Sequence, residues 1–326
     1  MDTSTHITMG FGLAGLAYID PSIAASPELA SAVLLGTVIG SNAPDFDFVY
    51  KVKGNSAYFR HHRGLSHSLP ALPLWALALS SIIWMFHQNV SFFHLFIWTF
   101  LAVILHVLFD IFNVYGTQAG RPISKEWLAL NCIPLFDPFI TGSHIVGFIL
   151  WYNGFHPGIC FLLIYGLISI YLLERYFSMK RTLNFISLHS GKIGQIKLIP
   201  SMSWINWGFI IENDTHYYVG SLKNKRIELK HTFQKLVEDT DILKKARQDE
   251  NVQNFLSSTN YAHPLVITKP HGYEVRWFDL RFRSKNHYPL MAVVQLNKDL
   301  IIQSSFTGWF HQTDQIEKKL SLQKSM

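Results

Sequence analysis

The run of residues 92–112, FFHLFIWTFLAVILHVLFDIF, constrains the fold more than any other part of this 326-residue chain. It contains one carboxylate and no lysine or arginine. A helix needs about 20 apolar residues to cross the bilayer core, so this run predicts a membrane-spanning helix. Residues 69–86, LPALPLWALALSSIIWMF, carry no charge and fall only slightly short of that length. We therefore expect a helical membrane protein.

Shorter apolar runs lie in the same half of the chain, at residues 6–19, 29–40, 139–152 and 159–173. About fifteen helical residues reach only about 23 Å, which is short for a span. We expect these helices to be tilted, half-inserted or buried in a bundle. The stretch WYNGFHPG, at residues 151–158, predicts a break that makes the last two runs separate short helices. The number of true membrane crossings stays open.

Charge divides the chain into two parts. Residues 1–177 contain 7 Lys and Arg against 9 Asp and Glu, a net charge of −2, whereas residues 178–326 contain 21 against 13, a net charge of +8. The long apolar runs are confined to the first part. We predict a mainly α membrane bundle at residues 1–177, followed by a small, basic α+β soluble domain at residues 178–326.

The α+β prediction rests on short alternating runs that are typical of strands, bounded by turn residues. These runs are residues 194–200, 207–213, 216–222, 273–283 and 288–297. Residues 229–257 are predicted to be helical, because a partial apolar stripe runs along them. The stripe consists of Leu229, Phe233, Leu236, Val237 and Leu243.

Polar residues that bind metals occur at every other helix end of the predicted bundle. If the first four helices alternate in direction, all of these residues meet on one side. They are His6 at the start of the first helix, Asp45 and Asp47 just after the second, His62 and His67 just before the third, and His106 and Asp110 at the end of the fourth. The opposite turns carry no such cluster. The short loops on the cluster side also hold the Lys and Arg residues, which predicts a cytoplasmic site and a cytoplasmic C-terminal domain.

His106 and Asp110 are four residues apart, so a helix places them on one face. An ionisable pair within an apolar helix is costly without a partner, which makes it a candidate functional site. A mutual hydrogen bond that only satisfies both groups is the alternative. Asp45 is expected to bind a metal directly, while Asp47 binds a second ion or orients a histidine. The alternative for both is an ordinary loop with solvated aspartates.

The segment RHHRGLSHS, at residues 60–68, is predicted to deliver His62 and His67 to the site, with Gly64 bending the backbone between them. Arg63 is suited to a bidentate hold on an anionic substrate oxygen. Ser66 is expected to cap the following helix. Asp137, in IPLFDPF, is an eighth candidate ligand, with helix capping as its alternative.

Imidazole and carboxylate ligands without cysteine suit zinc, manganese or iron, and their number suffices for one or two ions. Two metals bridged by aspartate are typical of phosphoester hydrolysis, in which metal-bound water is the nucleophile. Nucleotide-loop, nucleophile-elbow and HExxH motifs do not occur in the sequence.

The motifs taken together resemble the YdjM family of bacterial membrane proteins, which are described as metal-dependent hydrolases. The resemblance covers residues 1–175 and rests on His6, PDFD at 44–47, HRGLSHS at 62–68, HVLFD at 106–110, and GT at 116–117 with IPLFDP downstream. It implies a helical membrane fold, distantly similar to zinc-dependent phospholipase C, with the His and Asp residues as ligands. Some family members are called repressor-binding. The resemblance does not explain the basic C-terminal half.

The sequence therefore predicts a multi-pass protein of the bacterial plasma (inner) membrane with a divalent-metal hydrolase site at the cytoplasmic interface. A phospholipid or another amphiphilic phosphoester is the expected substrate. Asp47 and Arg63 are the predicted catalytic side chains. The alternative is a membrane-tethered regulatory or interaction protein with a structural metal or polar site, whose C-terminal domain binds a protein partner.

The basic charge of the C-terminal domain favours anionic membrane lipids over nucleic acid, because no nucleic-acid-binding signature is present. Trp204, Trp207 and Trp277 are expected either in the core or as anchors at the membrane interface.

Overall fold

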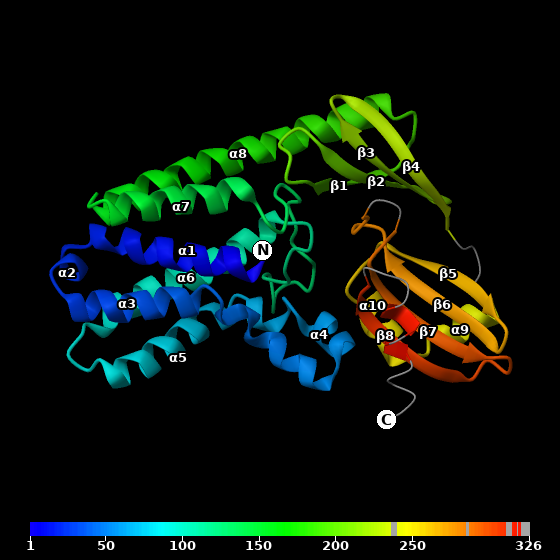
Figure 1. Ribbon diagram of the computed structural model, residues 1–326, viewed down its shortest axis with the longest axis horizontal. Helices are drawn as coiled ribbons and strands as arrows, with labels where there is room; N and C mark the ends of the chain where they lie inside the picture. Colours follow the sequence, from blue (N-terminus) through cyan, green and yellow to red (C-terminus); the bar gives the residue numbers. More distant parts are fainter. Residues whose placement is uncertain (236–239, 285–286, 311–314, 318, 321–326) are drawn as a thin grey trace. The chain divides into compact units, whose positions relative to one another are not determined.

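The computed structural model describes residues 1–235, 240–284, 287–310, 315–317 and 319–320. The chain divides into two compact units (Figure 1). The first consists of Met1–Phe46, Arg63–Ile186 and Leu198–Trp207. The second consists of Asp47–His62, Ser187–Lys197 and the described residues from Gly208 onward. The predicted division at residues 177/178 falls inside a helix, and it stays a prediction.

The first unit is a helical bundle, which confirms the predicted fold class of this part of the chain. Its α-helices are α1 (Thr3–Leu16), α2 (Pro21–Ala24), α3 (Pro27–Gly40), α5 (Ala71–Phe86), α6 (Phe92–Phe112), α7 (Pro138–Tyr152) and α8 (Pro157–His189). Short 3-10 helices lie at η1 (Ala17–Ile19) and η3 (Leu65–His67). Within the described part of the chain, α6 and α8 are long and apolar enough to cross a membrane.

Helix α8 is longer than the sequence predicts. The apolar run ends at Leu173, but the helix continues to His189. The reason is that residues 174–189 contain neither proline nor glycine, so nothing breaks the backbone when the composition becomes polar. The predicted break between residues 151 and 158 is present, since α7 ends at Tyr152 and α8 begins at Pro157.

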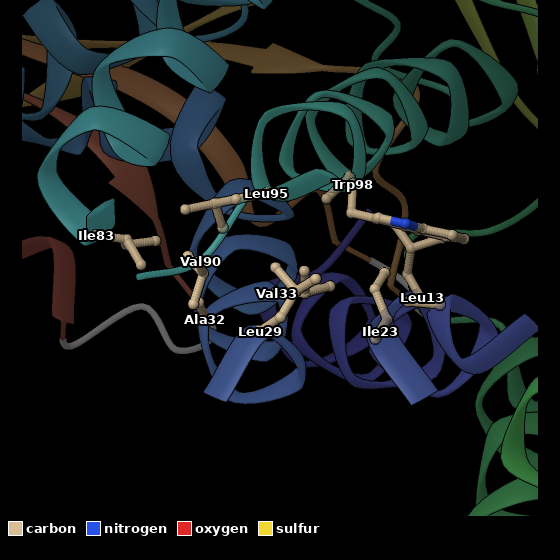
Figure 2. Packing of buried hydrophobic residues seen from close by; sticks show 11 residues of the cluster. Leu13, Ile23, Leu29, Ala32, Val33, Ile83, Val90, Leu95 and Trp98 are labelled. Carbon is tan, nitrogen blue, oxygen red and sulfur yellow. The ribbon is translucent and has the colours of Figure 1, made fainter. Parts of the chain in front are cut away.

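An apolar core fills the bundle at the end that contains α2 (Figure 2). Leu13 of α1, Leu29 and Val33 of α3, and Leu95 and Trp98 of α6 pack there and are almost fully buried. Burial of large apolar side chains is the main driving force for such packing. The other ends of α1, α3 and α6 carry the polar residues described below.

Close helix packing positions α3 against both neighbours. A Cβ on Gly10 of α1 would lie 2.8 Å from Val38 Cα, and a Cβ on Gly36 of α3 would lie 2.3 Å from Thr99 Oγ1 of α6. Only glycine permits these approaches. The spacing between α1 and α3 is therefore set by backbone contact, and the spacing between α3 and α6 by contact with the Thr99 side chain.

The second unit contains two four-stranded sheets. Strands β1 (Gln195–Pro200), β2 (Trp207–Glu212), β3 (His216–Lys223) and β4 (Arg226–Gln234) form one sheet in that order. Strands β5 (Ala262–Lys269), β6 (Gly272–Asp279), β7 (Leu290–Asn297) and β8 (Ile302–Trp309) form the other, with antiparallel neighbours. The boundary between the units falls within β1, because Lys197 belongs to the second unit and Leu198–Trp207 to the first.

Helices α4 (Asn55–His61), α9 (Asp241–Ala246) and α10 (Glu250–Leu256) also belong to this unit. Asn254 of α10 joins α4 to the sheet domain, because its amide contacts Arg60 and Ser56. The combination of helices and sheets confirms the predicted α+β class.

The prediction of a helix over residues 229–257 is wrong in its first part. Residues up to Gln234 form β4, which pairs with β3 through Tyr217 and Phe233 among others. Asn224 and Lys225 adopt positive φ values, and this tight turn sends the chain back along β3. Leu229 and Phe233 are thus strand residues, Leu243 lies in α9, and Leu236 and Val237 lie outside the described residues. Strands β5 and β8 were not predicted.

Candidate metal centre

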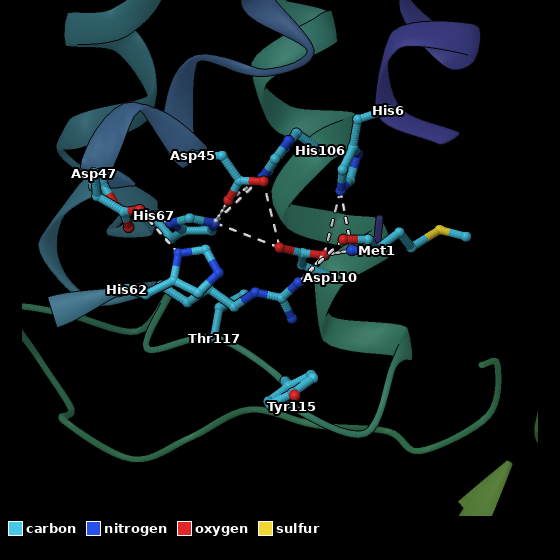
Figure 3. A network of polar contacts seen from close by, with 12 residues as sticks. Met1, His6, Asp45, Asp47, His62, His67, His106, Asp110, Tyr115 and Thr117 are labelled. Atoms are coloured by element: carbon cyan, nitrogen blue, oxygen red, sulfur yellow. Dashed lines mark hydrogen bonds and ion pairs between the residues drawn. The ribbon is translucent and has the colours of Figure 1, made fainter. Parts of the chain in front are cut away.

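Four of the predicted ligands converge in the first unit: Asp45, His67, His106 and Asp110 (Figure 3). Each offers one ligand atom, and these atoms all lie within 4.8 Å of one another. Asp45 follows the end of α3, His67 lies in η3, and the other two lie one turn apart on α6. Alternating helix direction thus brings these ends together, as the sequence predicts.

The four ligand atoms are His67 Nε2, His106 Nε2, Asp45 Oδ1 and Asp110 Oδ2. The two nitrogens are 3.2 Å apart. Asp45 Oδ1 lies 3.5 Å from each nitrogen, and Asp110 Oδ2 lies 3.4 Å and 3.5 Å from them. Ligands bound tetrahedrally at about 2.0–2.2 Å would be about 3.3–3.6 Å apart. The residues therefore fit a four-ligand N/O site.

The imidazoles are oriented by contacts at their other nitrogens. His106 Nδ1 lies 2.7 Å from the carbonyl oxygen of Ser41, so it donates a proton there and leaves Nε2 with its lone pair. His67 Nδ1 lies 2.9 Å from Ser66 Oγ. Such contacts fix the ring of a metal-binding histidine. The expectation that Ser66 caps the next helix is wrong, because α5 begins only at Ala71 and Pro70 precedes it.

Asp110 uses its two carboxylate oxygens differently. Asn113 Nδ2 donates to Oδ1 over 3.1 Å, and Arg63 Nη2 lies 3.1 Å from the same oxygen. Oδ2 accepts no hydrogen bond from any residue that the structure describes, although it is fully buried. A buried charged oxygen without a donor is costly, and a cation between the histidines would remove that cost.

His6 lies beside this group. Its ring stacks on His106 with centroids 3.8 Å apart, and its Nε2 lies 3.4 Å from Asp110 Oδ1. The α-amino group of Met1 contacts both His6 Nε2, at 3.0 Å, and Asp110 Oδ1. The structure therefore brings His6 to the cluster through Asp110 Oδ1, and direct metal binding by His6 stays a prediction.

Asp47 and His62 belong to the second unit, where Asp47 Oδ1 lies 2.8 Å from His62 Nδ1. A carboxylate that orients an imidazole in this way is the role expected for Asp47 as an alternative to metal binding. Their part in a metal site stays a prediction.

Arg63 is buried and adopts a positive φ of 62°. Besides Asp110, its guanidinium donates to Asn113 Oδ1 at 3.1 Å, to Gly116 O at 3.4 Å and to Met1 O at 3.3 Å. Arg63 thus links the carboxylate of the site to the loop after α6. Its predicted hold on a substrate oxygen is untested by these contacts.

Asp137 lies away from the four-residue group and caps α7. Its Oδ1 accepts from the backbone N–H groups of Phe139 and Ile140, and its Oδ2 accepts from the Tyr171 hydroxyl over 2.7 Å. This arrangement corresponds to the capping alternative. Metal binding by Asp137 stays a prediction.

Two residues next to the site were missed in the sequence. Asn113 accepts from the N–H groups of Tyr115 and Gly116 as well as from Arg63, and it donates to Asp110. Its position three residues after Asp110, at the end of the apolar run, was the available signal. The carbonyl oxygen of Ser41 could not be identified from the sequence, because a backbone acceptor has no sequence signature.

Comparisons with known proteins cover both halves of the chain. A family model described as YdjM inner membrane protein matches residues 1–181, and one described as YfhP C-terminal alpha/beta plait domain matches residues 241–320. The uncharacterized protein YfhP of Bacillus subtilis (strain 168) is 42% identical over 324 residues, which is 99% of each chain. No solved structure matches.

Proposed function

Since this chain belongs to the YdjM family of inner membrane proteins, we propose that it is a membrane-bound hydrolase that depends on a divalent metal ion. The proposed ligands of the ion are Asp45, His67, His106 and Asp110. The observation that carries the proposal is the spacing of their ligand atoms, which all lie within 4.8 Å of one another. The two imidazole Nε2 atoms lie 3.2–3.5 Å from each other and from both carboxylate oxygens. Ion pairing alone does not require two imidazole Nε2 atoms and two carboxylate oxygens to face one point.

The proposed substrate is a phospholipid or another amphiphilic phosphoester. His106 and Asp110 lie in the last two turns of α6, a candidate membrane span, so a site built there meets the membrane surface. A divalent ion would lower the pKa of a bound water and stabilise negative charge on a phosphoryl oxygen. Zinc, manganese and iron all suit the ligand set.

The protein's own side chains would bind and orient the substrate. The Asp45 side chain is 20% exposed while the other three ligands are buried, so substrate would approach past Asp45. Arg63 would hold an anionic oxygen through its guanidinium. Asp47 would orient His62 and accept a proton, and the pair would serve a second ion if one binds. The positive loops support a cytoplasmic site and C-terminal domain.

The alternative proposal is a membrane-tethered interaction protein with a structural metal or polar site. The observation that favours it is the bonding of Arg63, whose guanidinium contacts Asp110, Asn113 and backbone oxygens. Such a network ties a loop to a helix without any substrate. In this alternative the basic second unit would bind a protein partner.

Hydrolysis by the full-length protein separates the two proposals. The chain in lipid vesicles would be loaded with zinc or manganese and assayed on bis(p-nitrophenyl) phosphate and on short-chain phosphatidylglycerol. Hydrolysis is expected to stop with a chelator, to return with the metal, and to fall to background in His106→Ala. The control is His94→Ala, at the other end of α6. Hydrolysis that persists in folded His106→Ala would contradict the catalytic role of the metal site. If His106→Ala fails to fold and the unmodified chain shows no hydrolysis, the result would favour a structural role.

A further inference from the structure

The connection between β1 and β2, residues 201–206, exposes large apolar side chains. Met202, Trp204 and Ile205 are 65%, 52% and 64% exposed. Trp207, directly after the connection, is 2% exposed and Trp277 of the second unit is equally buried. Of the three tryptophans considered in the sequence, only Trp204 is thus at the surface. Neighbouring exposed apolar side chains indicate an interaction surface.

The connection is fixed to the helical bundle. The Trp204 ring lies 5.2 Å from the ring of Tyr171 on α8 and 5.4 Å from that of Phe139 on α7, between ring centroids. Arg175 of α8 is 2% exposed and donates to the Trp204 carbonyl oxygen over 2.9 Å. The exposed side chains therefore keep a defined position beside the middle of α8.

Hydrogen bonds inside the connection prepare its backbone for an apolar environment. Ser201 Oγ accepts from the Ser203 N–H over 3.2 Å and donates to the Asn206 carbonyl oxygen over 2.7 Å. Backbone groups without partners are costly in lipid, whereas groups bonded within the protein are tolerated there. The serine thus lowers the cost of moving this segment out of water.

The surroundings on α8 are those of a membrane interface. Leu173 and Phe177 are 59% and 54% exposed on this candidate span, so the apolar surface continues up to the level of the connection. Lys180 and Arg181 follow within the next turns. An apolar helix surface followed by aromatic and then basic side chains is the usual order at the boundary between lipid tails and anionic headgroups.

We infer that residues 201–206 form a membrane-interface anchor that binds an anionic lipid bilayer. Met202, Trp204 and Ile205 enter the headgroup region, and Lys180 and Arg181 bind the anionic headgroups.

The anchor also reaches the candidate metal centre. Arg175 donates to the carbonyl oxygen of Cys132 over 2.9 Å, and the Cys132 N–H donates to the carbonyl oxygen of Phe112, two residues after Asp110. This chain of hydrogen bonds fixes the depth of the site relative to the bilayer surface.

Fluorescence quenching tests the anchor in the full-length chain. Ile205→Cys would carry a bimane label in vesicles of phosphatidylcholine and phosphatidylglycerol. Ile301→Cys is the matched control, because Ile301 is a similarly exposed isoleucine of the second unit, at 59%. The unsubstituted chain is the labelling blank, since Cys132 and Cys160 are buried. Quenchers would be a lipid with a nitroxide near its headgroup and aqueous iodide.

The expected result is severalfold stronger quenching by the nitroxide lipid, and severalfold weaker quenching by iodide, at position 205 than at position 301. Trp204→Ala should reduce this difference, and Lys180→Gln with Arg181→Gln should remove its dependence on phosphatidylglycerol. Equal iodide quenching at both positions would overturn the inference in favour of a water-exposed loop. Protection of position 205 from both quenchers would overturn it in favour of a protein-covered surface.

Discussion

At the scale of single residues, Asp110 organises the candidate site. One oxygen binds Asn113, Arg63 and the Met1 amino group, while the other faces the two imidazoles. A buried carboxylate needs such compensation, because an isolated charge in an apolar bundle is strongly disfavoured. The pattern HVLFD showed that a polar pair lies on one helix face, but it did not show which oxygen faces the histidines.

Asn113→Ala should weaken metal binding by about 10–100-fold, the usual effect of losing a residue that orients a ligand. The substitution removes a donor to Asp110 Oδ1 and an acceptor for Arg63. The measurement is a zinc or manganese titration of the purified chain against a competing chelator.

Asn251→Ala is the matched control for this titration. Asn251 is also partly buried and hydrogen-bonded, but its partner is Ser305 in the second unit. Its metal affinity should equal that of the unmodified chain. An unchanged affinity in Asn113→Ala would show that Asp110 does not need this residue to bind a metal.

At the scale of helices and strands, the bundle was largely predictable and the site geometry was not. Except at the C-terminal end of α8, apolar runs and turn residues located the helices within a few positions, because composition changes sharply at the helix ends. Alternating direction then placed the ligand residues on one side. The separation of ligand atoms depends on close approaches such as that at Gly10, which a single sequence does not reveal.

The error at residues 229–234 has a different origin. Charged and apolar residues alternate weakly there, so a helical and a strand pattern both fit. The turn at Asn224 and Lys225 decides between them, because it brings the following residues into register with β3.

Gly10→Ala should destabilise the bundle by about 1–3 kcal/mol, as expected for an added group in a close-packed contact. Its Cβ would lie 2.8 Å from Val38 Cα and 2.9 Å from the Thr37 carbonyl oxygen, so α1 and α3 would have to separate. The measurement is the apparent melting temperature in detergent.

Gly166→Ala is the matched control on α8, where a Cβ would meet no described atom within 4 Å. Here alanine should leave stability unchanged or raise it by up to about 1 kcal/mol, because it favours helix formation. Equal melting temperatures for the two variants would argue against backbone contact between α1 and α3.

At the scale of the whole molecule, the sequence similarity to the relative from Bacillus subtilis extends over both the bundle and the α/β unit of this chain. The function of the second unit was the less predictable part. Its basic charge favours anionic partners but indicates no catalytic or metal-binding residues. One titratable group in it gives a test that is independent of the metal centre. Burial, together with the nearby charge of Arg281, lowers the pKa of Lys197 to about 8, while Asp279 opposes the shift.

A lysine with a lowered pKa binds fewer protons in the folded state than in the unfolded state between pH 8 and its ordinary value of 10.5. The stability of the protein should therefore rise with pH across this window. Lys197→Met should raise the melting temperature at pH 7, and this advantage should shrink as the pH approaches 10. A constant difference across the range would show that Lys197 does not titrate in this way.

The amount of divalent metal that each chain binds is the decisive test of the proposed metal centre. The unmodified protein, His67→Ala and Asp110→Ala would be purified in detergent, loaded with zinc or manganese, dialysed and analysed by elemental mass spectrometry, with His94→Ala as control. We predict at least about one equivalent in the unmodified protein and in the control, because a site with four ligands is complete. Both ligand variants should bind much less while remaining folded. Absence of bound metal in the unmodified protein, or equal amounts in all four, would contradict the proposed metal centre.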